Sequence, residues 1–111
     1  MNEAAKSNWP GMSGKQYTFE IYPIGTTFNE VPGNYIFAKQ VRPGSWQSCY
    51  IGQAENLKNR LADHEKQTCA IRNGATHIHA HVNYGGEQTR GIEERDLILL
   101  HQPCCNEQYV S

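Results

Sequence analysis

The chain has 111 residues, of which 38% are hydrophobic and 19% are charged, and its formal net charge at pH 7 is −1. This length accommodates one domain with a single modest core and disfavours a pair of domains. The near-neutral charge argues against tight, sequence-blind binding to nucleic acid, which depends on neutralising many phosphates. It does not exclude an enzyme that contacts only a few of them.

The sequence shows no sign of a membrane or secreted protein. No apolar run approaches the length of a membrane span, and residues 1–11 lack the basic start and apolar stretch of a secretory signal. The four cysteines, at positions 49, 69, 104 and 105, form no C-x-x-C pair, and the two adjacent ones cannot readily bridge each other. We therefore expect a cytoplasmic protein with reduced thiols, without a zinc ribbon or a disulfide framework.

The first half of the chain predicts strands. Residues 1–15 are polar and rich in Gly, Ser and Asn, which indicates a flexible N-terminal arm ahead of a single domain over residues 16–111. Three segments have the composition or alternation of strands: residues 17–22, 35–38 and 46–51. The turn at Pro43 and Gly44 predicts an antiparallel hairpin from the last two.

After Gly52 the period changes to that of a helix. Asn56 is a suitable N-cap, and Leu57 and Leu61 share one face of a helix predicted over residues 56–66. Three later segments complete the pattern: a short helix over residues 68–73, a strictly alternating strand over 76–83 and a helix over 87–101. The elements predict an α/β fold with a small, mainly antiparallel sheet flanked by helices.

Several polar and aromatic residues stand at spacings that would bring them together. Tyr35 and Tyr50 lie on the two strands of the hairpin, and Arg60 follows in the next helix with His64 one turn later. Glu94 lies in the last helix, and Asn106 follows the proline that stops it. Together these types can hold a phosphate, bind a hard cation and move a proton.

This order and spacing resemble the GIY-YIG nuclease superfamily. Its first tripeptide appears as Gly33-Asn34-Tyr35 and its second as Tyr50-Ile51-Gly52. Its helix arginine, Tyr-or-His position, glutamate and late asparagine match Arg60, His64, Glu94 and Asn106. The stretch EERDLILLHQPCCN is similar to the end of the nuclease domain in bacterial excision-repair endonucleases, and the resemblance covers residues 33–107.

The resemblance implies a core of three strands, near residues 33–39, 46–51 and 76–83, to which residues 17–22 add a further strand. It also implies a DNA endonuclease that hydrolyses phosphodiester bonds with Mg²⁺ or Mn²⁺ bound by Glu94. In that mechanism Arg60 holds the phosphate, Tyr35 or His64 takes the proton of the water, Tyr50 orients, and Asn106 supports the site. DNA is the expected partner, together with a separate DNA-binding or targeting protein.

Two positions depart from the family pattern. Asn34 replaces the isoleucine of the first tripeptide, and Gln53, a second candidate for contacting substrate, stands where many members have lysine. The missing charge and the neutral chain leave open an alternative function, a catalytically weak or inactive module that binds DNA or a protein. Two further alternatives concern single residues: Glu93 competes with Glu94 as metal ligand, and Arg60 taken alone is an ordinary helix residue paired with Glu65.

A rival site lies in the strand over residues 76–83. His77, His79 and His81 alternate, so all three imidazoles point to one face and resemble a set of zinc ligands. We favour a half-exposed strand with a histidine-rich face, because alternation alone sets no ligand geometry. A third interpretation is that these histidines line a groove for DNA.

Overall fold

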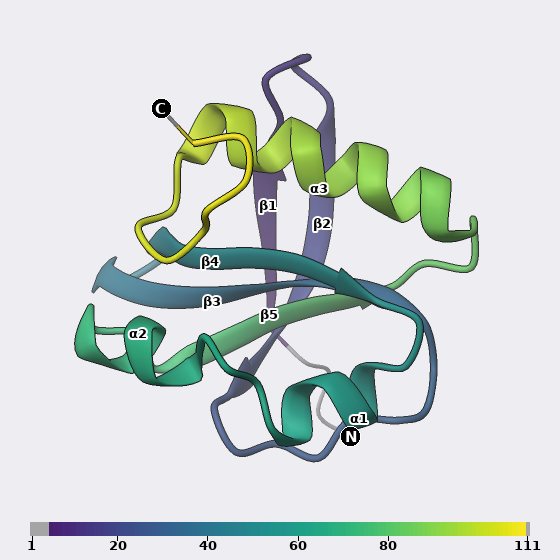
Figure 1. Cartoon of the computed structure of the whole chain (residues 1–111). Coiled ribbons are helices and arrows are strands. Elements are labelled where there is room, and N and C mark those ends of the chain that lie inside the picture. Colours follow the sequence, from purple (N-terminus) through teal and green to yellow (C-terminus); the bar gives the residue numbers. More distant parts are fainter. Residues whose placement is uncertain (1–4, 111) are drawn as a thin grey trace.

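The computed structural model describes residues 5–110, which form one antiparallel sheet with helices on both faces (Figure 1). The elements follow in this order: β1 (Lys6–Pro10), β2 (Gln16–Pro23), β3 (Gly33–Arg42), β4 (Ser45–Ala54), α1 (Leu57–Ala62), α2 (Gln67–Arg72), β5 (His77–Val82) and α3 (Glu87–His101). None of the helices in the described part of the chain is long and apolar enough to span a membrane.

The sheet has the strand order β1-β2-β5-β3-β4, and all neighbours are antiparallel. The predicted hairpin is β3–β4, in which Tyr35 pairs with Gly52 and Tyr50 with Phe37. The two tyrosines of the predicted site therefore stand on neighbouring strands, as expected. This register places the candidate tyrosines beside one another at the β3–β4 pair, and β4 is an edge strand of the sheet.

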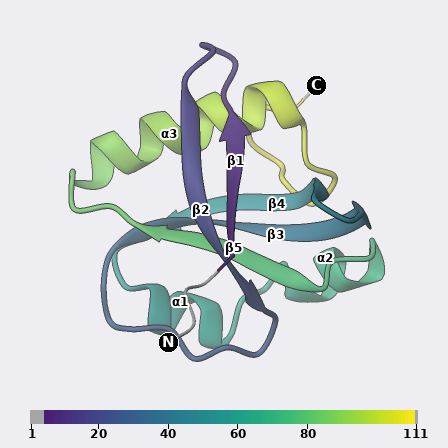
Figure 2. The same ribbon diagram turned by 180° about the vertical axis from the view of Figure 1, so that it is seen from behind.

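Each face of the sheet carries its own core. Helices α1 and α2 cover one face, where Phe37, Leu57 and Ile78 are buried, and α3 covers the other, where Phe19, Ile36 and Leu97 are buried (Figures 1 and 2). Neighbouring residues of β3 pack into opposite layers, as the alternation of a strand requires. The sheet thus forms a middle layer between α1 and α2 on one side and α3 on the other, and β3 contributes to both cores.

The N-terminal segment differs from the flexible arm predicted for residues 1–15. Residues 6–10 form β1, paired with β2, and Trp9 in that strand is only 4% exposed. The turn that follows is held by Asp96 of α3, which accepts hydrogen bonds from Ser13 and Tyr17. These partners lie more than seventy residues away, so local composition could not reveal them, and residues 1–4 lie outside the described part.

Helix α1 is shorter than the predicted span of residues 56–66. Asn56 is its N-cap, as predicted, and its side chain accepts a hydrogen bond from the Asn59 amide. The helix ends at Ala62, because the backbone dihedral angles of Asp63 are not helical. His64 therefore lies in the loop after the helix and not one helical turn beyond Arg60.

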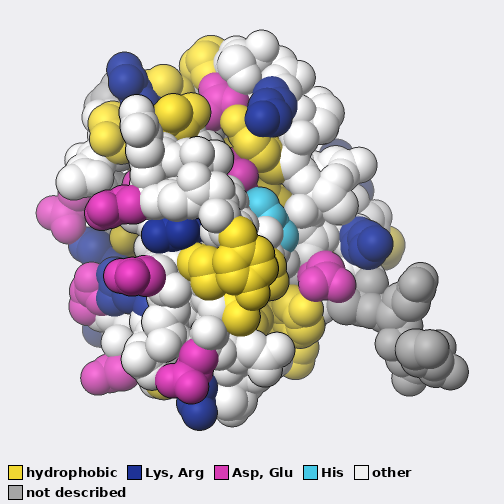
Figure 3. All heavy atoms as spheres, turned by 90° about the vertical axis from the view of Figure 1, so that its right-hand side faces the viewer, with side chains coloured by type: hydrophobic (Ala, Val, Ile, Leu, Met, Phe, Trp, Pro, Cys, Tyr) yellow, Lys and Arg dark blue, Asp and Glu magenta, His cyan; other side chains and the backbone are white. Residues whose placement is uncertain are grey.

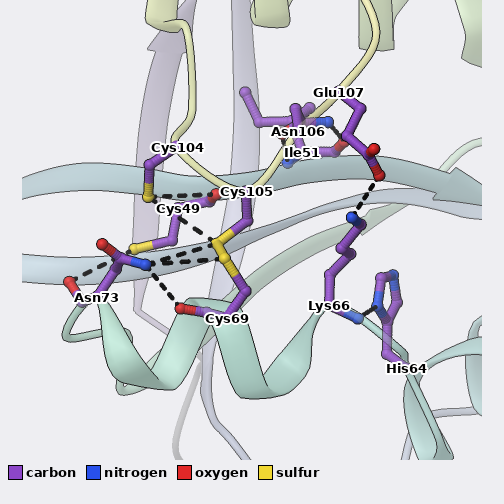
Figure 4. The surroundings of a disulfide bond; sticks show 10 residues. All are labelled: Cys49, Ile51, His64, Lys66, Cys69, Asn73, Cys104, Cys105, Asn106 and Glu107. Carbon is purple, nitrogen blue, oxygen red and sulfur yellow. Dashed lines mark hydrogen bonds and ion pairs between the residues drawn. A yellow bond between two sulfur atoms is a disulfide. The ribbon is translucent and has the colours of Figure 1, made fainter.

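The expectation of reduced thiols throughout is wrong in this structure, because Cys69 and Cys105 form a disulfide between α2 and the C-terminal segment. The buried thiol of Cys49 and the exposed thiol of Cys104 lie beside it (Figure 4). The bridge spans 36 positions of sequence. Cysteine spacing alone did not show the pairing, since only the folded sheet brings α2 and the tail together.

Candidate active site

Both glycines of the hairpin motifs are required by close packing. A Cβ atom at Gly52 would lie 2.5 Å from the Tyr35 hydroxyl oxygen, so glycine lets the Tyr35 ring lie directly across β4. At Gly33 a Cβ atom would clash with the carbonyl oxygen of His81 on β5. Gly52 thus leaves room for the buried Tyr35 ring, which is 1% exposed, while Gly33 lets β3 lie close to β5.

Tyr35 and His64 form a buried hydrogen-bonded pair. The Tyr35 hydroxyl lies 2.7 Å from His64 Nε2, and the backbone amide of Lys66 donates to His64 Nδ1 at 3.0 Å. Burial lowers the pKa of the His64 imidazole to about 4, and the positive charge of Arg60 acts in the same direction. A neutral ring that accepts at Nδ1 carries its proton on Nε2, so His64 donates to the Tyr35 oxygen.

Arg60 lies beside both tyrosines and forms an ion pair with Glu65. Its guanidinium donates to the two carboxylate oxygens of Glu65 at 2.5 and 2.8 Å, and its side chain is 32% exposed. Burial raises the pKa values of Tyr35 and Tyr50, and the nearby Arg60 charge acts in the opposite direction. The pairing weighed from sequence is therefore present, while the guanidinium still lies near both hydroxyls.

The two adjacent glutamates of α3 point to different places. Glu93 is 6% exposed and contacts His81 and Asn83, which places it under the helix against β5. Glu94 is half-buried and lines a pocket of about 400 Å³ together with Tyr50. Burial raises the pKa of the Glu94 carboxyl to about 6, opposed by a hydrogen bond from the Gln53 backbone amide.

Asn106 attaches the C-terminal segment to the edge of the sheet. Its side chain accepts a hydrogen bond from the Ile51 amide and donates to the Ile51 carbonyl, both at 2.9 Å (Figure 4). Glu107 next to it pairs with Lys66, which follows the loop that carries His64. Asn106 therefore builds the wall of the pocket that contains Tyr50 and Glu94.

The two departures from the family pattern meet at one residue that sequence reasoning missed. The Gln53 side chain accepts a hydrogen bond from Arg90 Nε at 3.0 Å, and Asn34 donates to the Arg90 carbonyl at 2.9 Å. Arg90 is 5% exposed and lies on α3 one turn before Glu94. The spacing of four between Arg90 and Glu94 was the available signal in the sequence.

The three histidines of β5 have separate surroundings. His79 is fully buried, with its Nδ1 bonded to Ser7 and Trp9, whereas His81 contacts Glu93 and His77 contacts Thr76. The preferred interpretation of a half-exposed, histidine-rich face holds only in part, since His77 and His81 are partly exposed whereas His79 between them is fully buried. Within residues 5–110 no group of three or more potential ligands is placed to hold a metal ion.

A hard divalent cation fits the pocket at Glu94 on chemical grounds. A half-buried carboxylate with a raised pKa has lost part of its hydration, and a bound cation can restore the lost stabilisation of its negative charge. A site of one carboxylate suits Mg²⁺ or Mn²⁺, which keep several of their waters. Most of the remaining wall is polar, with Tyr50, Asn106 and Glu107 among its residues, and it also includes Ile98 and Lys66.

Comparison with solved structures identifies the fold, whereas no family model and no curated protein matches the sequence. The N-terminal GIY-YIG endonuclease domain of UvrC from Thermotoga maritima, solved with its catalytic magnesium ion, is similar over 71% of this chain and 86% of that chain. The TM-score is 0.57 and the identity 29%. Two tyrosine-to-phenylalanine variants of that domain, each bound to a divalent cation, give a TM-score of 0.57 at 27% and 28% identity. They cover 72% of this chain and 87% of theirs.

Proposed function

Because the chain has the fold of the GIY-YIG nuclease domains, we propose that it is a DNA endonuclease that depends on a divalent metal ion, Mg²⁺ or Mn²⁺. The observation that carries this proposal is the gathering of Tyr50, Arg60 and Glu94 around the edge strand β4, with Tyr35 and His64 beneath them. These residues come from four segments of the sequence: β3, β4, α1 with the loop after it, and α3. A purely structural role would not require the Arg60 guanidinium and a half-buried carboxylate, that of Glu94, beside two tyrosine hydroxyls.

Arg60 is the proposed phosphate ligand. Its guanidinium already presents a pair of parallel hydrogen bonds to the Glu65 carboxylate, and a phosphate offers the same two-oxygen geometry. Glu65 is exposed, with 62% of its side chain accessible, so it can leave the guanidinium at small cost. In the free protein the Glu65 carboxylate thus occupies the position on the Arg60 guanidinium that we assign to the substrate phosphate.

Tyr50 is the group we assign to the attacking water, in place of Tyr35 or His64. Tyr50 lines the same pocket as Glu94, whereas Tyr35 and His64 are buried and bonded to each other. His64 also carries its proton on the nitrogen that faces Tyr35, so it cannot accept another there. We therefore propose that Tyr35 and His64 position Tyr50 and Arg60 through the packed rings between them.

Glu94 is the proposed metal ligand, and Gln53 and Asn106 are supporting residues. A bound divalent cation would neutralise charge on the phosphate and acidify a coordinated water. Gln53 orients the Glu94 carboxylate with its backbone amide. Asn106 keeps the opposite wall of the pocket attached to β4.

The deciding experiment is cleavage of plasmid DNA in Mg²⁺ or Mn²⁺ by the unmutated protein, by Glu94→Ala and by Glu30→Ala. Glu30 is an exposed glutamate that lines none of the site's walls, so its variant is the matched control for loss of one carboxylate. Nicking by the unmutated protein and by Glu30→Ala, with none by Glu94→Ala, is the expected result. Absence of cleavage on plasmid, flap and branched DNA would favour the alternative, an inactive module that binds DNA or a protein.

DNA is the proposed partner, and a separate DNA-binding or targeting protein is the proposed source of most of the affinity. The neutral net charge supports this division of roles, since the chain alone neutralises few phosphates.

A further inference from the structure

We infer that Arg90 and the first turn of α3 form a second binding site, for a phosphate group. The inference rests on the proposed function for its ligand, which is a DNA phosphate next to the one being cleaved. Arg90, Gln53, Gly86 and Pro32 line a pocket of about 570 Å³ beside the catalytic one. The pocket lies where α3 begins, at the right-hand side of the molecule in Figure 1.

The first observation is a buried cation without a counter-ion. The Arg90 guanidinium donates to Gln53 Oε1 at 3.0 Å and to the Asn83 carbonyl at 3.4 Å, and both acceptors are neutral. Among the described residues no carboxylate forms an ion pair with it. Removing a charge from water without a partner is costly, so a residue that is 5% exposed in this way favours an anionic ligand.

The second observation is the bare N-terminus of α3 in the same pocket. The N-cap is Gly86, which has no side chain to accept the free amides of the first turn. The partial positive charge of a fifteen-residue helix therefore faces the pocket together with the guanidinium. The first turn of α3 and the guanidinium thus line one pocket, and free amides at a helix N-terminus are groups that bind phosphate.

The third observation connects this pocket to the catalytic one. Gln53 contacts both sites, with its side chain on Arg90 and its backbone amide on Glu94. Arg90 and Glu94 are four residues apart and so lie on one face of α3, about 5–6 Å apart at Cβ. If Arg60 and Glu94 hold one phosphate of a DNA strand, a neighbouring phosphate of the same DNA strand would therefore lie at the Arg90 pocket.

Two carboxylates also line the pocket, and they define a useful variant. Glu55 and Glu87 are exposed, and neither pairs with Arg90. Their repulsion of an anion is weakened by water and salt, whereas the attraction of the buried guanidinium is weakened much less. Replacing Glu87→Gln should consequently strengthen phosphate binding.

The first test uses inorganic phosphate, so it does not depend on cleavage. Amide resonances of residues 87–89 and the Arg90 Nε–H resonance are followed by ¹⁵N NMR during titration with phosphate. Affinity is expected to fall about tenfold in Arg90→Gln, for the loss of a charge-assisted pair, and to rise in Glu87→Gln. Arg95→Gln, a matched loss of an exposed charge on the same helix, should leave it unchanged.

The second test separates a DNA phosphate from a free one. Binding of a labelled duplex oligonucleotide is measured by fluorescence anisotropy in EDTA for the same variants. Weaker binding by Arg90→Gln but not by Arg95→Gln supports the assignment to DNA. Phosphate binding with unchanged DNA affinity would overturn that assignment and leave a site for free phosphate.

Equal losses in Arg90→Gln and Arg95→Gln, or no resonance shift on addition of phosphate, would overturn the site itself. If Arg90→Gln does not fold, the unmutated protein, Arg90→Lys and Glu87→Gln still decide the question. Arg90→Lys retains the charge but loses the paired donors, so its phosphate affinity should be intermediate. Failure of plasmid cleavage would count against the proposed function without affecting the phosphate titration.

Discussion

The hydrogen bond between His64 and Tyr35 has a direction, and that direction assigns the two tyrosines different roles. The Tyr35 oxygen accepts from a neutral imidazole inside the core, while Tyr50 faces the pocket. Tyr50→Phe should therefore lower the single-turnover cleavage rate about 10²–10⁴-fold without changing stability. Tyr35→Phe leaves the His64 N–H unpaired and should cost about 1–3 kcal/mol of folding free energy.

Measuring cleavage and urea unfolding on both tyrosine variants separates these roles. A stable, fully active Tyr50→Phe together with an inactive Tyr35→Phe would reverse our assignment and restore Tyr35 as the group that meets the water.

Arg60 is expected to contribute to the transition state rather than to stability. Arg60→Ala should lose on the order of 2–4 kcal/mol of transition-state stabilisation, seen as a lower single-turnover rate, by analogy with the removal of one preorganised donor. Its partner Glu65 is exposed, so the ion pair itself adds little to folding. Glu65→Gln should free the guanidinium and weaken neither folding nor cleavage, and a near wild-type rate in Arg60→Ala would end this mechanism.

Titration of two buried histidines predicts that stability depends on pH. The pKa values of His64 and His79 are lowered to about 4 by burial, whereas unfolded histidine titrates near 6.5. The unfolded chain therefore binds more protons between these values, and the free energy of unfolding should fall as the pH drops from about 6.5 to 4. Urea unfolding at pH 7 and pH 4.5 measures this, and equal stabilities would contradict neutral, buried imidazoles.

Cleavage should fall at a higher pH than that set by an ordinary carboxylate. The Glu94 pKa, raised to about 6 by burial, means that without metal the ligand becomes protonated below that value. A proton and a metal ion compete for the same oxygens, so the metal concentration for half-maximal cleavage should increase as the pH falls through 6. A value that stays constant between pH 7 and pH 5.5 would remove Glu94 as the ligand.

The tail after α3 is attached to the rest of the fold at two points. The Cys69–Cys105 disulfide links it to α2, and Asn106 links it to β4 (Figure 4). A bridge that closes 36 positions restricts the unfolded chain, so Cys69→Ser should lower the free energy of unfolding by about 3–4 kcal/mol. Cys104→Ser, which removes an exposed free thiol, should change it little, and equal losses would mean that packing at this site matters more than the bridge.

How much of each element was predictable depends on how local its determinants are. The β3–β4 hairpin, the Asn56 cap and α3 follow from alternation, capping chemistry and helical period, and all three are found. Strand β1 and the disulfide depend on partners distant in sequence. The sequence predicted a flexible arm where β1 lies and reduced thiols where the disulfide lies. The site lies between these cases: its residues came from a motif, but the bond between Tyr35 and His64 required the fold.

On the face of the molecule where α3 begins, the charges of the described residues do not form a continuous basic surface for long DNA (Figure 3). Acidic and basic side chains are intermixed on the side where α3 begins, without a continuous basic patch (Figure 3). The net charge of −1 gives no general attraction to a polyanion. For the proposed function, we therefore expect contact with DNA to depend on the few cations near the edge strand β4.

This distribution predicts the salt dependence of DNA binding. Arg90 and Lys66 line the two pockets and Arg60 lies beside Tyr50, so about two or three phosphates should be neutralised. The logarithm of the affinity should then fall with the logarithm of the salt concentration with a slope of about −2 to −3, at about −0.9 per phosphate. Anisotropy of a labelled duplex at several salt concentrations measures this slope in the unmutated protein and in Arg90→Gln, where it should be smaller in magnitude by about one. A slope of about −6 or steeper would reveal a basic surface that the fold does not show, and would make a separate DNA-binding partner unnecessary.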